Sequence, residues 1–167
     1  DLTMNSSGTI FRGNGGNASD PIVANVSDTN TGYFYPAADT LAVTTGGSER
    51  VRIDSSGRLL LGTTTEGQAD ADNLTIADSG SCGITLRSGT SAAGAIYFSD
   101  ATSGAAEYDG AVLYNHSSQY MAFYANESER LRIISTGYVG IGTNVNGDIT
   151  SPLVVDKGAS NGAALQL

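Results

Sequence analysis

A stretch of sixteen residues occurs twice in this chain, at positions 48–63 and 128–143. The copies read Ser-Glu-Arg-Val-Arg-Ile-Asp-Ser-Ser-Gly-Arg-Leu-Leu-Leu-Gly-Thr and Ser-Glu-Arg-Leu-Arg-Ile-Ile-Ser-Thr-Gly-Tyr-Val-Gly-Ile-Gly-Thr, with nine of the sixteen positions identical. A fixed internal period is typical of arrays and fibres built from one structural unit. A repeat without conspicuous chemical groups is better suited to spanning distance or presenting a surface than to catalysis.

Apolar and polar residues alternate within each copy, which predicts strands rather than helices. In Arg50-Val51-Arg52-Ile53 the two arginines share one face of a strand, and Val51 and Ile53 share the other. The glycine that follows, Gly57 or Gly137, can supply the positive φ of a short hairpin loop. Hairpin strands are expected at about 50–54 and 58–62, and at 130–134 and 138–142. The side chains expected to be buried are Val51, Ile53, Leu131, Ile133 and Ile141.

Polar runs after each hairpin indicate joints between units. Further strands are expected at 74–76, 82–87, 94–99, 108–114, 120–125 and 153–155. The expected organisation is an irregular lead-in or the end of a preceding unit at 1–19, a first β unit at 20–63, a linker at 64–72, a second β unit at 73–143, a linker at 144–151 and the start of a truncated third unit at 152–167.

The composition favours an all-β fold, because glycine numbers 22, tryptophan is absent and there is a single lysine, which leaves few strong helix formers. The net charge of −9 and the lack of a basic cluster disfavour nucleic-acid binding. No apolar run approaches the roughly 20 residues of a membrane span, so membrane insertion is not expected. Cys82 is the single cysteine, which excludes an intrachain disulfide, and it is expected to be half-buried.

The repeated motif resembles segments in the shafts of bacteriophage tail fibres. The residues that carry the resemblance are Glu129-Arg130-Leu131-Arg132-Ile133 with Gly137 and Gly140-Ile141-Gly142-Thr143, and the run Asp28-Thr29-Asn30-Thr31-Gly32 to Asp39-Thr40-Leu41. The resemblance covers roughly residues 20–155. It implies a repetitive, elongated, fibrous β-structure of short strands and hairpins, forming an intertwined homotrimer. It also implies an extracellular place in the virion, other tail or fibre proteins as partners, and a structural role in host attachment.

No catalytic, cofactor-binding or metal-ligating constellation is expected, and the chain is interpreted as a non-enzyme. His116 is the only histidine and lies in an apparent turn without a surrounding motif. Glu49 and Glu129 precede arginine-rich strands, so ion pairs with an arginine of a neighbouring strand or chain are expected rather than a pair of hydrolytic carboxylates. The residues assigned to the structural repeat are Glu49, Arg50, Arg52, Ile53, Gly57, Glu129, Arg130, Arg132, Ile133 and Gly137.

Two alternatives stay open beside the shaft interpretation. One is a tailspike-like segment that degrades or binds polysaccharide, and the other is a repeat of a bacterial surface adhesin or filament. If the segment binds a host surface glycan, loops projecting from the second unit are expected to provide the site, since they combine aromatic and polar groups. The residues proposed for such a site are Tyr108, Asp109 and His116.

Overall fold

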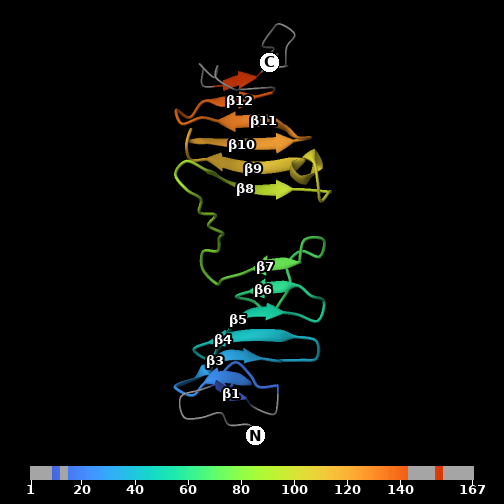
Figure 1. The fold of residues 1–167 in the computed structure, drawn as a ribbon, viewed down its shortest axis with the longest axis vertical. Coiled ribbons are helices and arrows are strands. Elements are labelled where there is room, and N and C mark those ends of the chain that lie inside the picture. Colours follow the sequence, from blue (N-terminus) through green and yellow to red (C-terminus); the bar gives the residue numbers. More distant parts are fainter. Residues whose placement is uncertain (1–8, 12–14, 143–152, 156–167) are drawn as a thin grey trace. The chain divides into compact units, whose positions relative to one another are not determined.

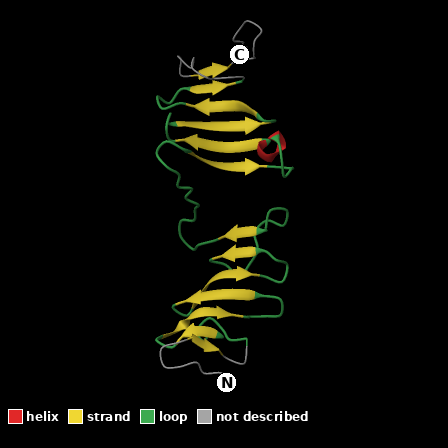
Figure 2. Ribbon diagram, in the orientation of Figure 1, coloured by secondary structure: helices red, strands yellow, loops and turns green. Residues whose placement is uncertain are grey.

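The computed structural model of the chain describes residues 9–11, 15–142 and 153–155. The fold is all-β, as predicted: strands account for every regular element except one short 3-10 turn (Figure 2). The chain divides into two compact units, Asp1–Ile84 and Thr85–Leu167. Each unit builds its own sheet (Figure 1).

The first unit is a seven-stranded sheet in which strands adjacent in sequence are adjacent in space. Its strands are β1 (Thr9–Phe11), β2 (Val23–Asn25), β3 (Asp28–Phe34), β4 (Leu41–Thr45), β5 (Ser48–Ile53), β6 (Leu59–Leu61) and β7 (Leu74–Ile76). All pairs are antiparallel except β6 with β7, which is parallel. Within the described residues, no helix or second sheet lies over this layer.

The second unit is a six-stranded sheet with the same meandering order. Its elements are β8 (Ala93–Phe98), the 3-10 turn η1 (Ala105–Tyr108), β9 (Gly110–Asn115), β10 (Tyr120–Ala125), β11 (Ser128–Ile133), β12 (Val139–Ile141) and β13 (Leu153–Val155). Only the pair of β12 with β13 is parallel. The four strands from β10 to β13 therefore repeat the plan of β4 to β7.

The hairpins predicted from the repeat are confirmed. β5 pairs antiparallel with β6, and β11 with β12. The loop glycines carry the expected positive φ, 81° at Gly57 and 85° at Gly137. These signals are local, which is why alternation and one glycine suffice to predict each hairpin.

The segment between the sheets, residues 77–92, forms no strand, so the strand predicted at 82–87 is wrong. Ile84 and Leu86 are 64% and 51% exposed, respectively, and therefore lack the packing that would hold an extended segment in a sheet. Glycines at 80, 83 and 89 offer no side chain to such packing. Cys82 in this segment is exposed rather than half-buried.

Strand β7 lies in the first sheet, whereas the sequence-based boundaries place it at the start of the second unit. The connection from Gly62 to Asn73 is long enough to return the chain to the same edge for parallel pairing with β6. At its start, Gly62 has a φ of 73°, and a Cβ there would lie 2.2 Å from the carbonyl oxygen of Ala77. A glycine is required at this position for both reasons.

Candidate functional site

A β-bulge in each copy of the motif changes which side chains share a face. Strand residues three positions apart normally point to opposite faces. The register of β4 with β5 shifts by one residue and leaves Arg50 as the extra residue, and the register of β10 with β11 does the same at Arg130. The extra residue reverses the alternation, so the glutamate and the second arginine of each motif lie on the same face.

Both motifs hold a bidentate ion pair. Arg52 Nε and Nη2 donate to the carboxylate of Glu49 at 2.6 and 2.8 Å. Arg132 Nε donates to Glu129 Oε1 at 2.8 Å, and its Nη2 donates to Oε2. Each glutamate thus has an arginine partner as expected, but the partner lies on the same strand and not on a neighbouring strand or chain.

The second pair is more enclosed than the first. The side chains of Arg132 and Glu129 are 11% and 10% exposed, against 20% and 15% for the first pair. The guanidinium of Arg132 lies 3.9 Å from the centre of the Tyr120 ring, and Tyr124 donates its hydroxyl to Glu129 at 3.2 Å. Burial, and then the charge of Glu129, raise the pKa of Tyr124, so this donor stays protonated. The charges satisfy one another, which argues against either glutamate acting as a catalytic acid or base.

A second ionic network exists in the first unit. Arg58 donates to Asp54 at 2.7 Å and to Asp72 at 2.8 Å, and lies 3.7 Å from Glu66. Hydrogen bonds to Asp72 and Asp54 raise the pKa of Arg58. The second copy of the repeat has Tyr138 at the position of Arg58. This network ties the hairpin loop to the following connection in the first unit, and Tyr138 cannot form the same ion pairs in the second.

This network predicts that the stability of the first unit falls in acid. Burial alone would raise the pKa of Asp54, but hydrogen bonds from the backbone and side chain of Arg58 and from the backbone of Ser56 lower it below 3.8. A lowered folded-state pKa means that the interaction stabilises the unit above pH 3.8 and is lost as the pH falls through the folded-state value. We expect Asp54→Asn to be less stable than the wild type near neutral pH, and equal to it in acid, in thermal melts at each pH. A difference that persists unchanged in acid would contradict this origin.

The opposite face of the first sheet is apolar. Cross-strand partners line up in two rows, Tyr33, Val43, Val51, Leu61 and Ile76, and Leu41, Ile53, Leu59 and Leu74. These nine residues are called the first apolar face. Six of the nine side chains are 37% exposed or more. A contiguous exposed apolar surface marks an interaction site more often than a free surface.

The second sheet carries a matching surface. Its rows are Ile96, Val112, Phe123, Leu131 and Ile141, and Gly94, Tyr114, Met121, Ile133 and Val139. These ten residues are called the second apolar face. Neither face contains a charged residue, and the motif residues of the two units occupy corresponding positions in the rows.

The burial predicted for the motif side chains is wrong for the single chain. Ile53, Ile133 and Ile141 are 45%, 39% and 39% exposed, and Val51 and Leu131 are half-buried. The predicted separation of these residues from Arg52 and Arg132 onto opposite faces holds. These side chains stay exposed because each unit is a single layer of strands. A face of a single-layer sheet is buried only where another element or another chain packs on it.

The residues proposed for glycan binding are not brought together. Tyr108 and Asp109 precede β9, whereas His116 follows its other end, so the length of a six-residue strand, about 17 Å, separates them. The His116 ring lies 5.0 Å from that of Tyr114, and its backbone N–H donates to the Ala92 carbonyl. Tyr108 instead faces a pocket that it shares with residues absent from the prediction, Tyr124 and Glu127.

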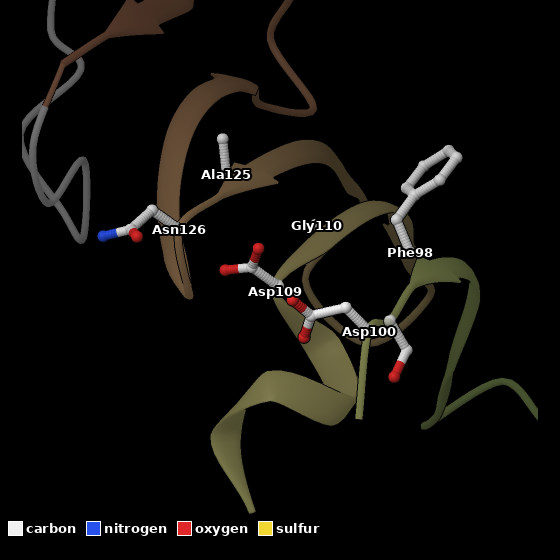
Figure 3. A pocket seen from close by; sticks show the side chains of 7 residues that line it. Phe98, Asp100, Asp109, Gly110, Ala125 and Asn126 are labelled. Atoms are coloured by element: carbon white, nitrogen blue, oxygen red, sulfur yellow. The ribbon is translucent and has the colours of Figure 1, made fainter. Parts of the chain in front are cut away.

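Asp109 lines a different pocket, at the end of the second sheet (Figure 3). This pocket has a volume of about 310 Å³ and is also lined by Asp100 and Asn126. The ring of Phe98 points away from the two carboxylates in this view. Among the described residues, no group of three or more acidic, histidine or cysteine side chains is placed to hold a metal ion.

No helix in the described part of the chain has the length and apolar character needed to cross a membrane. Comparison of the sequence with models of known protein families gives no match. Comparison with curated proteins likewise gives none.

Proposed function

We propose that this chain is a structural shaft segment of a phage tail fibre in which three identical chains associate through their apolar faces. The observation that carries the proposal is that both units present an uncovered apolar face at the same positions of the repeat. In this role the segment supports host-cell attachment, in contact with other tail or fibre proteins of the virion, and performs no catalysis.

Burial of these faces against another protein surface would be energetically favourable. Burial of apolar surface stabilises by about 25 cal/mol per Å². The described hydrophobic core residues that the chain itself buries are few and mostly small: Ala24, Phe34, Ala42, Leu60, Ala111 and Ala122. A single-layer sheet with so small a core gains most of its further stability from an added layer.

A second copy of the same chain is the cover that fits best. The repeat places the same kind of face on both units, so an identical chain offers a matching apolar surface to each of them. The faces contain no charge to be desolvated, while the net charge of −9 per chain is carried elsewhere and favours solubility of the assembly. The number of chains, three, rests on the resemblance of the motif to tail-fibre shafts.

Sedimentation velocity and native mass measurement test the proposal. A particle of three times 17.0 kDa is expected at micromolar concentration. A chain that remains a stable monomer at that concentration would overturn the proposal, and a dimer would overturn its stoichiometry.

A further inference from the structure

A pocket lined by three tyrosines opens on the face of the second sheet that carries the ion pair. It has a volume of about 320 Å³ and is formed by Tyr97, Tyr108, Ala111, Leu113, Tyr124 and Glu127. Tyr97, Ala111 and Tyr124 are cross-strand partners on β8, β9 and β10, and Tyr108 ends η1. Ala111 is 5% exposed, so this small side chain forms part of the floor. We call this cavity the tyrosine pocket.

In the described part of the first sheet, the chain itself covers the corresponding row of residues. The residues at the positions of Tyr97, Ala111 and Tyr124 are Ala24, Gly32 and Thr44. Thr44 is fully buried and donates its hydroxyl to the Ala18 carbonyl at 2.8 Å. Residues 15–21 thus lie over this row in the first unit. In the second unit Tyr97 of the corresponding row is 57% exposed and Tyr124 is half-buried, and Tyr108 beside the row is 48% exposed.

Glu127, at the rim of the pocket, has a positive φ, which glutamate rarely adopts. The two-residue turn from β4 to β5 is Gly46-Gly47, with φ of 57° and 75°. The matching turn from β10 to β11 is Asn126-Glu127, with φ of 52° and 59°. Such conformations concentrate at functional sites. The backbone hydrogen bond is the same in both units, Gly47 to the Asn30 carbonyl and Glu127 to the Asp109 carbonyl, so the difference lies in the side chain delivered to the rim.

We propose that the tyrosine pocket binds one sugar ring of a neutral glycan. The C–H groups on the face of a pyranose carry a slight positive charge, and they pack against the negative faces of aromatic rings. The tyrosine hydroxyls and the Glu127 carboxylate are hydrogen-bond partners for sugar hydroxyls. A small pocket of mainly aromatic and apolar lining with a few polar groups is typical of small-molecule sites.

The charge of the pocket selects against anionic sugars. Its lining contains a carboxylate and no lysine or arginine. The guanidinium of Arg132, which acts on Tyr124, is paired with Glu129, and Arg130 donates its Nε to the Ala125 carbonyl at 3.0 Å. Phosphorylated or sialylated sugars would bring a second negative charge beside Glu127. The pocket lies on the face opposite the second apolar face, so it remains open when that face is covered.

Saturation-transfer NMR with the intact chain tests the site. The probes are the methyl glycosides of glucose, galactose, mannose and N-acetylglucosamine, with N-acetylneuraminic acid as the anionic comparison. At least one neutral glycoside is expected to bind at millimolar concentration, and the acid to bind more weakly. Absence of binding by all four neutral probes, or preferential binding of the acid, would overturn the proposal.

Two variants locate the binding. Tyr97→Ala removes an exposed wall of the pocket and Ala111→Leu fills its floor, and each is expected to weaken binding about tenfold. Tyr35→Ala is the control for Tyr97→Ala, because it removes another exposed tyrosine, 48% against 57% exposed, from the first unit. Affinity unchanged in both pocket variants, or lost equally in the control, would place the sugar elsewhere and overturn the proposal.

The inference stands apart from the shaft role. Tyr97→Ala is expected to sediment like the wild-type chain, since Tyr97 belongs to neither apolar face. Failure of the wild type to assemble would refute the shaft proposal and leave sugar binding measurable on the monomer. Dissociation of the assembly by Tyr97→Ala would instead identify this face as a contact between chains and overturn the sugar site.

Discussion

Replacing Ile133 with aspartate is expected to convert the proposed trimer into monomers while leaving the single chain folded. Ile133 lies in the second apolar face and is 39% exposed in the chain alone. A carboxylate there stays hydrated in a monomer, and exposed substitutions of this kind usually change stability by only about 0.5 kcal/mol. If three chains cover the face, each buries an unpaired charge, which costs on the order of 3–5 kcal/mol per chain. The predicted effect therefore arises almost entirely from association.

Ser135→Asp is the matched control for that substitution. It adds the same charge two residues away, in the exposed hairpin loop, and should sediment and melt like the wild type. Circular dichroism of Ile133→Asp distinguishes a folded monomer from an unfolded chain. If Ile133→Asp retains the wild-type mass and melting temperature, the second apolar face is not an interface. If the wild type is itself monomeric, the variant should differ from it hardly at all.

The hairpins of the repeat could be predicted because the signals are local. Alternating Val51 and Ile53 set the faces, and a glycine with positive φ closes each loop, so no knowledge of distant residues is needed. The burial of the same side chains could not be predicted in this way. Burial depends on what lies over a face, and a period of two identifies the apolar face without identifying its cover.

The ion-pair geometry was only partly predictable. Strict alternation puts Arg50 and Arg52 together and sends Glu49 to the other face. The bulge at Arg50 reverses this, and its signal in the sequence is the complementary charge of two residues three apart in a strand, present in both copies. A strand that keeps such a pair twice is a candidate for a bulge.

The tyrosine pocket shows a second limit of the sequence. Tyr108 could be selected as an aromatic residue in a polar loop, but its neighbours Tyr97 and Tyr124 come from two other elements. The register that joins them is visible only in the folded sheet. The sequence does contain one signal. The first copy has Gly46-Gly47 before its motif, whereas the second has Asn126-Glu127. Glycines suit the positive φ of such a turn, so their replacement indicates that the side chains at this position have a role of their own.

Removing Glu129 is expected to destabilise the second unit more than removing Glu49 destabilises the first. Glu129→Ala leaves the Arg132 guanidinium, 11% exposed, without its carboxylate and leaves the Tyr124 hydroxyl without its acceptor. The cost should be about 2–3 kcal/mol, because a largely buried charge loses its partner. Glu49→Ala affects a more exposed pair, at which Thr44 occupies the position of Tyr124. We expect a cost of about 1 kcal/mol there, since solvent replaces more of the interaction.

Hydrogen exchange measures the two losses of stability separately. Each unit has its own sheet, so the free energy of local unfolding can be measured for each sheet from its own amides. Amides of β11 should lose protection in Glu129→Ala, and amides of β5 should lose less in Glu49→Ala. Glu107→Ala removes an equal charge from the exposed turn η1 and serves as the control. Added salt should reduce the loss of stability caused by Glu49→Ala more than the loss caused by Glu129→Ala, because salt screens mainly exposed ion pairs. Equal losses in the two variants would show that the additional contacts of Glu129 and Arg132 with Tyr124 and Tyr120 contribute nothing to the stability of the second unit.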